Sequence, residues 1–205
     1  VVVGGANNTI TNSGTIQSTG NFARAIELGE GFTLTNSGDI IAVGRAVTTT
    51  DNADITNSGT ISAVEEEGIQ LASGSVTNQA GGTISGTVGI AAAPGASDPL
   101  TVANFGAING SAADAGTGRI DAVVFGDGND EFQQWTGAST AGWVDLGMGD
   151  DTFVLEGSSS SIAGSVDGGD GNDSAILAGT LDSDNLVGFE AYQLGSQLGG
   201  TLNDL

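Results

Sequence analysis

The chain contains no cysteine, no histidine and no lysine, and only two of its 205 residues are proline. Without cysteine it forms no disulfide and offers no thiolate to a metal ion. Without histidine it lacks the side chain that most often acts as a general base near neutral pH and that activates the serine of serine proteases. If the protein is extracellular, its stability must therefore come from its architecture.

Positive charge is also scarce. Three arginines, Arg24, Arg45 and Arg119, face 25 acidic residues, which leaves a formal net charge of −22. Such a body repels nucleic acid and anionic membrane surfaces, so we expect cations, or neutral or basic partners. No apolar run approaches the roughly 18 residues that cross a bilayer, and no signal peptide opens the chain, so no direct membrane insertion is expected. Because the first residue is Val1, we expect a processed or excised piece.

Glycine is abundant, with 36 residues, and a short motif recurs between branched apolar residues. The segment "ITNSGTI" stands at 10–16 and again at 55–61, and related segments lie between and after them. Their asparagines are separated by 24, 21, 21 and 26 residues, a period typical of a solenoid. These asparagines are Asn12, Asn36, Asn57, Asn78 and Asn104.

Within each period, apolar and polar residues alternate over short runs such as "RAIEL" and "GIQL". This alternation predicts strands of about three to five residues with one buried face, and helical spacing is not sustained anywhere. Three such strands and their turns use about 21 residues, which is one coil of a parallel β-helix. We therefore predict an all-β fold, a right-handed parallel β-helix (β-solenoid) of about nine coils of 21–26 residues.

Stacked coils place equivalent residues about 4.8 Å apart, so internal columns are expected. We interpret the five asparagines as structural corners, because Asn tolerates the left-handed backbone of a sharp turn and stacked amides can hydrogen-bond along a column. The glycine that follows lets the chain turn without a Cβ clash. Three apolar columns are expected inside: Ile10, Leu34, Ile55, Val76 and Val102; Ile16, Ile40, Ile61, Ile84 and Ile108; and Ile26, Val47, Ile69 and Ile90.

The corner motif changes after about residue 117. "FGDGNDEF" (125–132), "LGMGDDTF" (146–153) and "GGDGNDSA" (168–175) recur at spacings of 21 and then 22 residues, and 14 of the 25 acids lie between Asp114 and Asp184. Because the period is that of the first block, we predict one continuous rod. In it, residues 1–116 form coils with Asn-x-Gly corners, and residues 117–205 continue the same β-helix with Gly/Asp-rich corners.

Over residues 125–175 these octamers partly resemble the calcium-binding repeat of RTX proteins, without its nine-residue tandem. Superposed coils would place like charges about 5 Å apart, where they repel by roughly 1 kcal/mol per pair in water. Either each carboxylate accepts hydrogen bonds from the backbone of its own glycine-rich turn, or Ca²⁺ lies between coils. The candidate calcium ligands are Asp127, Asp130, Asp150, Asp151, Asp170 and Asp173.

Two segments and two tryptophans are candidate binding elements. Variation in coil length indicates bulges at 63–68, which contains Glu65, Glu66 and Glu67, and at 91–99, which contains both prolines. Such bulges are where a solenoid often places recognition, although a solvated loop without a function explains them as well. Trp135 and Trp143 flank a polar segment, and indoles exposed there could stack on sugars; alternatively, they close one side of the helix.

The order of the motifs resembles that of the passenger region of bacterial autotransporters (type V secretion). The evidence is the "ITNSGTI" coils, the "GDGND" coils and then "LVGFEAYQL" (186–194), since similar passengers carry a phrase like Gly188–Phe189–Glu190 near their later coils. The resemblance implies a protein on the bacterial cell surface, linked to the outer membrane through a translocator barrel that is absent from this chain. The lack of cysteine agrees with it, because passengers thread an outer-membrane pore before they fold.

Two functions remain open at this stage. The first is a non-catalytic adhesin or stalk, a rigid rod that contacts a host-surface protein, a glycan or a sister cell through many weak polar contacts. The second is a polysaccharide-active enzyme, a lyase or hydrolase, which needs a basic group or paired carboxylates that converge in a groove. The repeats and the shortage of basic residues favour the adhesin, and no catalytic residue is assigned.

Overall fold

The structure, a computed structural model, describes residues 1–3, 6–157, 159–179 and 185–194. In this part the strands β1 to β25 form three sheets, every strand pair within a sheet is parallel, and no α-helix occurs. Two sheets have nine strands each and the third has seven. The prediction of an all-β parallel β-solenoid is therefore confirmed, with about eight full turns between the first and last strand of a sheet.

We name the sheets A, B and C. Sheet A contains β1 (Val2–Val3), β4 (Ile26–Leu28), β7 (Val47–Thr49), β10 (Ile69–Leu71), β13 (Ile90–Ala92), β16 (Asp121–Val124), β19 (Trp143–Asp145), β22 (Val166–Asp167) and β24 (Leu186–Val187). Sheet B contains β2 (Thr9–Asn12), β5 (Phe32–Asn36), β8 (Asn52–Asn57), β11 (Ser73–Asn78), β14 (Leu100–Asn104), β17 (Glu131–Gln134), β20 (Thr152–Leu155), β23 (Ser174–Leu177) and β25 (Ala191–Leu194). Sheet C contains β3 (Thr15–Ser18), β6 (Asp39–Ala42), β9 (Thr60–Ala63), β12 (Thr83–Ser85), β15 (Ala107–Asn109), β18 (Ser139–Ala141) and β21 (Ser161–Ile162).

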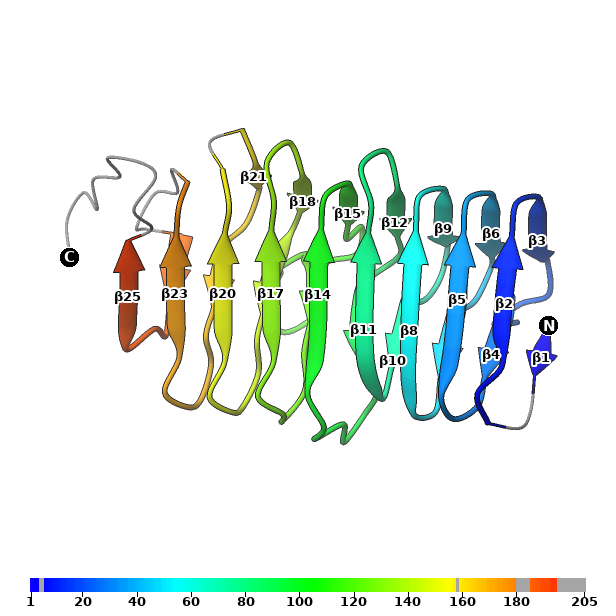
Figure 1. Ribbon diagram of the computed structural model, residues 1–205, viewed down its shortest axis with the longest axis horizontal. Helices are drawn as coiled ribbons and strands as arrows, with labels where there is room; N and C mark the ends of the chain where they lie inside the picture. The colour runs from blue at the N-terminus through cyan, green and yellow to red at the C-terminus, as the bar shows by residue number, and fades with distance from the viewer. Residues whose placement is uncertain (4–5, 158, 180–184, 195–205) are drawn as a thin grey trace.

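The chain runs along a strand of sheet B, crosses behind it to sheet C, returns through sheet A and begins the next coil beside the last (Figure 1). The coils wind in the right-handed sense, as expected for parallel crossovers. All three sheets continue across residue 117, since β13 pairs with β16, β14 with β17 and β15 with β18. Residues 195–205, the end of the second predicted block, lie outside the described residues.

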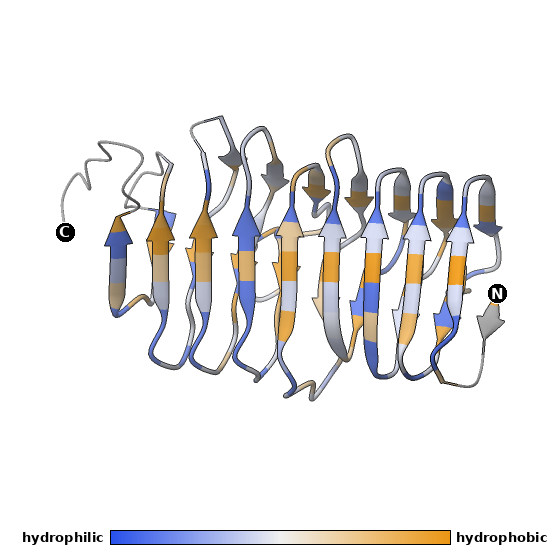
Figure 2. Cartoon of the chain, in the orientation of Figure 1, coloured by the Kyte–Doolittle hydropathy of each residue, from blue (hydrophilic) through white to orange (hydrophobic). Residues whose placement is uncertain are grey.

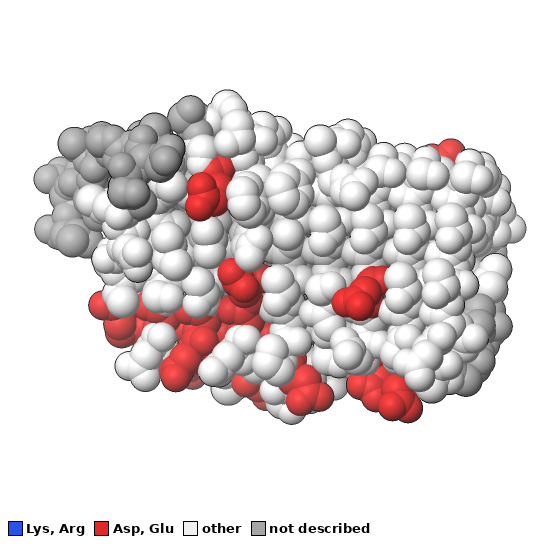
Figure 3. Space-filling view, in the orientation of Figure 1, with Lys and Arg blue, Asp and Glu red and all other residues white. Residues whose placement is uncertain are grey.

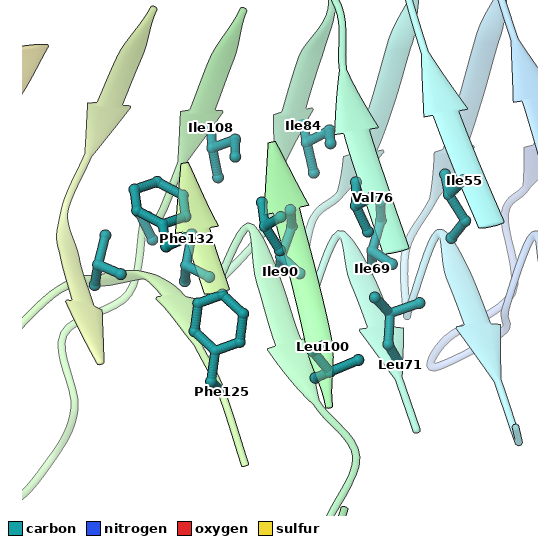
Figure 4. Packing of buried hydrophobic residues seen from close by; sticks show 14 of the residues in the cluster. Ile55, Ile69, Leu71, Val76, Ile84, Ile90, Leu100, Ile108, Phe125 and Phe132 are labelled. Atoms are coloured by element: carbon teal, nitrogen blue, oxygen red, sulfur yellow. The ribbon is translucent and has the colours of Figure 1, made fainter. Parts of the chain in front are cut away.

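The three apolar columns are present in the predicted register. In sheet B, Ile55 pairs with Leu34 on one side and Val76 on the other, and the columns in sheets A and C are formed in the same way. Hydrophobic residues accordingly recur at the same height from strand to strand (Figure 2), and their side chains fill the space between the sheets (Figure 4). In sheet B, apolar and polar residues alternate along strands such as β5 and β8, so one face is buried and the other is left to solvent, whereas β7 and β10 of sheet A are buried at every position.

The asparagines form a ladder of buried amides along the C-terminal ends of the sheet B strands. Asn36 Nδ2 donates to Asn57 Oδ1 at 2.8 Å, and Asn57 Nδ2 donates to Asn78 Oδ1 at 3.0 Å. Asn12 and Asn104 continue the ladder on either side, and Asn104 Nδ2 donates to Gln134 Oε1 at 3.1 Å. Asn36, Asn57, Asn78 and Asn104 are fully buried, so their hydrogen bonds are made away from water.

The prediction that the five asparagines adopt the left-handed backbone conformation of a sharp turn is wrong. The described non-glycine residues with positive φ are Asn7 and Phe22, so the ladder asparagines are not left-handed turn residues. They end strands, and their amides point inward. From the second coil on, the glycine after each asparagine is required by contact between coils, because a Cβ at Gly38 or at Gly59 would lie 2.1 Å from the carbonyl oxygen of the equivalent glycine in the preceding coil. A Cβ at Gly14, in the first coil, would have no other atom within 4 Å.

In sheet B of the second block, the aliphatic column continues as Phe132 and Phe153. Phe132 and Phe153 are fully buried and stack with their ring centroids 6.0 Å apart, and Phe153 lies 6.4 Å from Phe189. Stacked aromatic pairs add to the free energy gained by burial.

In the part of the chain that the structure describes, no helix has the length and hydrophobicity needed to span a membrane.

Candidate functional site

A column of buried carboxylates, here called the aspartate ladder, runs through the turns that lead from sheet A to sheet B. It consists of Asp130, Asp151 and Asp173, which are 2%, 1% and 0% exposed. Each Oδ1 atom accepts a backbone N–H from the preceding coil: Asp130 from Leu100 at 2.7 Å, Asp151 from Asp130 at 2.7 Å, and Asp173 from Asp151 at 2.8 Å. Glu190 ends the ladder by accepting the N–H of Asp173 at 2.8 Å.

Backbone N–H groups therefore donate to these carboxylates. The sequence predicted donors from the carboxylate's own turn, but most of them lie in the neighbouring coil. Within the ladder, Asp130 also accepts a bond from its own turn, from the N–H of Gly126 at 3.2 Å. The physical reason is the stacking itself, which places the N–H of one coil against the carboxylate of the next. The second oxygens of Asp151 and Asp173 are buried without a hydrogen-bond partner among the described residues.

Burial changes the charge state of the ladder. Loss of hydration raises the pKa of Asp130 to about 6 and that of Asp151 to about 7, although the amide donors act in the opposite direction. The pKa of Asp173 is also raised, again chiefly by burial. Protonation near neutral pH is thus a further way to relieve repulsion between stacked carboxylates, and the sequence reasoning did not foresee it.

A second column lies beside the ladder and is exposed to solvent. Asn129 Oδ1 accepts the N–H of Asp150 at 3.0 Å, and Asp150 Oδ1 accepts the N–H of Asn172 at 3.0 Å. Asp127 and Asp170 are exposed at the same edge. Figure 3 shows acidic side chains gathered along this edge toward the C-terminal half, and no basic side chain is visible on this face.

The six candidate calcium ligands are thus divided between a buried ladder and an exposed edge. Among the described residues, no group of three or more acidic side chains is arranged to hold a metal ion. Ca²⁺ takes six to eight oxygen ligands, whereas the ladder oxygens that have partners already accept backbone amides. The calcium hypothesis stays a prediction, and the capped, partly protonated ladder is its alternative.

The two alternatives differ in their response to calcium. If the ladder is capped and holds no calcium, the melting temperature should change by less than about 1 °C between EGTA and about 1 mM Ca²⁺, because a ligand stabilises only a state that binds it. We expect this result. Thermal unfolding followed by circular dichroism measures this. A rise of several degrees in Ca²⁺ but not in Mg²⁺ would establish a calcium site and would contradict the capped ladder as the full explanation.

Trp135 and two of the three glutamates of 63–68 make side-chain contacts within the chain. The Trp135 ring stacks on Phe105 with centroids 4.9 Å apart, and its Nε1 donates to Gln133 at 3.2 Å. Arg45 contacts Glu67 at 2.6 Å and Glu66 at 3.7 Å, so this arginine forms ion pairs with two glutamates of the segment. Glu65 is exposed.

Trp143 belongs to a cluster that the sequence reasoning missed, here called the Arg119 cluster. The Arg119 guanidinium lies 5.1 Å from the centre of the Trp143 ring and contacts three carboxylates from three successive strands of sheet A. It approaches Asp121 at 2.5 Å and Asp167 at 3.7 Å, and it hydrogen-bonds Asp145. Charge-assisted bonds and the cation–π contact act together on this one side chain.

The segment that carries Arg119 is an ordered loop, residues 110–120, between sheets C and A. Ala113 and Ile120 form an antiparallel bridge, and Asp114 Oδ1 accepts the N–H groups of Gly116 at 2.9 Å and Thr117 at 2.8 Å. These bonds lower the pKa of Asp114. The separation of 30 residues between Asn104 and Gln134, against 21 to 26 elsewhere in the ladder, is the sequence signal that could have located the loop.

The electrostatics of the cluster depend on partial burial. Burial acts to lower the pKa of Arg119. The hydrogen bond to Asp145 and the charges of the neighbouring carboxylates outweigh this effect, so the pKa is raised overall and the guanidinium remains charged. Burial raises the pKa of Asp121 in spite of Arg119. With one guanidinium and three carboxylates, the cluster carries a formal charge of −2 when all four groups are ionised.

Arg119→Met is expected to destabilise the chain by about 1–3 kcal/mol, because three stacked carboxylates would lose their shared cation. Arg119→Lys should restore little of the loss, since a single ammonium cannot reach three acceptors in a planar fork. Urea unfolding measures both. The matched control is Arg24→Met, which removes an exposed pair with Glu27 and should cost less than about 0.5 kcal/mol. Equal effects at both positions would contradict the special role of Arg119.

Comparisons of the chain with protein-family models, curated proteins and solved structures find no match. The fold is therefore assigned from the coordinates, and function must be argued from the surface and its clusters.

Proposed function

We propose that the chain is a non-catalytic rod from a bacterial surface adhesin or stalk, of the autotransporter passenger type. In this proposal it lies outside the cell, linked to the outer membrane through a translocator barrel. Its partners are a host-surface protein, a glycan or another cell of its own kind.

The observation that carries the proposal is the unbroken stacking of the coils. Three parallel sheets run side by side, and each buried ladder hydrogen-bonds one coil to the next. About eight turns at roughly 4.8 Å per turn give a rigid body about 40 Å long. A rod of this kind holds a binding surface at a fixed distance from its anchor, which is what a stalk requires.

The charges support partners other than nucleic acid. The three arginines all lie just before strands of sheet A, on the connections from sheet C, while acids gather at the opposite turns from sheet A to sheet B. An anionic polymer would meet a net charge of −22, whereas neutral glycans and proteins with basic patches would not be repelled.

The enzyme alternative has less support. Paired carboxylates such as Asp150 and Asp151 do not converge on a groove, because Asp150 is exposed and Asp151 is buried in the ladder. Arg45 and Arg119, which could have served as basic groups, are ion-paired. We expect no release of reducing or unsaturated ends when the chain is incubated with plant and bacterial polysaccharides; release would favour the enzyme over the adhesin.

An adhesion experiment tests the proposal. Beads coated with the chain are expected to remain on epithelial monolayers, or on bacteria that display the same chain, under flow that removes control beads. The control coating is a globular protein of similar size and negative charge, since charge alone affects attachment. Retention equal to the control on every surface would contradict an adhesive function.

A further inference from the structure

A shallow depression lies at the corner between sheets C and A, next to the Arg119 cluster. Its volume is about 450 Å³, within the range of roughly 300–1,000 Å³ typical of small-molecule sites. Trp143, Arg119 and Ile120 form one part of its lining, and Gly110, Gly142 and Gly164 from successive coils form another. We call it the corner depression.

The depression exists because the coils approach one another closely at this corner. A Cβ at Gly110 would lie 2.1 Å from the Asp121 carbonyl oxygen, and a Cβ at Gly164 would lie 2.6 Å from Cδ1 of Trp143. Glycine is therefore required at these positions, and the wall beside the indole carries no side chain there. The neighbouring residues Ala141 and Ala163 are small and exposed, so they leave the depression open.

The lining combines an aromatic surface with hydrogen-bonding groups. The partly exposed Trp143 and Ile120, which is 41% exposed, provide apolar contact area. Arg119 is the charged residue of the lining and provides N–H donors, whereas the carboxylates that it binds, Asp121 and Asp145, are not lining residues. A pyranose ring has the matching chemistry, with a C–H face that packs on an aromatic ring and hydroxyl oxygens that accept hydrogen bonds from a guanidinium group.

The charge of the cluster selects among sugars. Because three carboxylates surround one guanidinium, the site is negative overall and would repel uronates and other acidic saccharides. We propose that the corner depression binds a neutral oligosaccharide, with Trp143 as the stacking platform and Arg119 as the hydrogen-bonding group. This inference rests on the proposed function and gives its ligand a chemical class.

Fluorescence titration of Trp143 tests the inference on the full chain. The Trp135→Phe variant leaves Trp143 as the only tryptophan. Trp135 stacks on Phe105 and does not line the depression. Titration with cellotetraose and with tetra-N-acetylchitotetraose is expected to shift the Trp143 emission, with a Kd between about 0.1 and 5 mM for at least one of them. Tetragalacturonate, the anionic probe, should bind at least about tenfold more weakly.

A second variant separates binding from folding. Trp143→Ala removes the platform but also the contact with Arg119, so it alters stability as well. Ala163→Gln changes an exposed residue and occupies the depression with an uncharged, non-aromatic side chain. It should weaken sugar binding by about tenfold or more while leaving the melting temperature unchanged.

Three results would overturn the inference: no change in emission with either neutral sugar up to about 10 mM, tetragalacturonate binding as tightly as the neutral sugars, or undiminished binding by Ala163→Gln. The adhesion assay distinguishes this failure from failure of the proposed function. Beads coated with Ala163→Gln that adhere as well as the parent would remove the depression from the adhesive surface and leave the adhesin standing. Parent beads that never adhere would count against the adhesin whatever the sugar titration gives.

Discussion

Acidification from about pH 8 to about pH 5 is expected to raise the melting temperature of this protein by about 6–12 °C. The cause is the aspartate ladder, in which burial raises the pKa of Asp130 to about 6 and that of Asp151 to about 7. An unfolded aspartate titrates near 3.9, so the folded chain holds more protons than the unfolded chain between about pH 4 and pH 7. Stability is then greatest near pH 4 to 5 and falls as the pH rises through the folded pKa values.

The size of this effect follows from linkage. Each raised pKa favours the folded state only while the group is protonated. We expect Asp130 and Asp151 together to add about 3 kcal/mol to the free energy of unfolding between about pH 8 and pH 5, a value that allows for relaxation of the ladder around a charge. A chain of this length changes its melting temperature by about 2–4 °C for each kcal/mol. Thermal unfolding at a series of pH values and constant ionic strength measures the result.

Asp151→Asn isolates the ladder from the general charge of the chain. The amide keeps an oxygen to accept the N–H of Asp130 but cannot ionise, so this variant should be more stable than the parent at pH 8 and less sensitive to pH. Asp150→Asn is the matched control, because Asp150 is the exposed neighbour and the same charge is removed. If both variants keep the full pH dependence, or if the parent is most stable near pH 8, the explanation from buried carboxylates is wrong.

Asn57→Asp is expected to lower the free energy of unfolding by about 4 kcal/mol and the melting temperature by about 8–16 °C near neutral pH. Asn57 is fully buried, and its Nδ2 donates to Gly59 O at 3.0 Å, Asn78 Oδ1 at 3.0 Å and Thr83 O at 3.3 Å. A carboxylate has no proton to give to these three oxygens. One carboxylate oxygen would keep the hydrogen bond from Asn36 Nδ2, but the other would face these three acceptors as a buried charge, which is among the most destabilising changes a core can undergo.

The control for this variant is Asn21→Asp, an exposed position in the connection between β3 and β4 where the same charge is added. It should change the free energy of unfolding by less than about 0.5 kcal/mol, as surface substitutions usually do. Urea unfolding of both variants gives the comparison. A loss of less than about 1 kcal/mol for Asn57→Asp would mean that the amide ladder holds the coils together far less than its hydrogen bonds suggest.

Much of the candidate site lay beyond prediction, and for different reasons at different residues. Trp143 was identified from its place beside a polar segment, but its partner Arg119 comes from a loop whose path no repeat describes. The aspartate column was expected from the period, yet the period does not show that the N–H donors come from the preceding coil. Glu190 was noted only as part of a family phrase, whereas the structure shows that it closes the ladder.

The sequence alone determined the fold, because a separation of 21 to 26 residues that brings asparagine onto asparagine also brings every inward residue of one coil onto its counterpart in the next. Only the tertiary structure decided which atoms face one another within those columns. It turned Asn57 inward at a strand end rather than outward in a turn, and it gathered Asp121, Asp145 and Asp167 around one arginine. A period specifies which residues are neighbours, whereas hydrogen bonds and pKa values depend on side-chain direction and on the water that packing excludes.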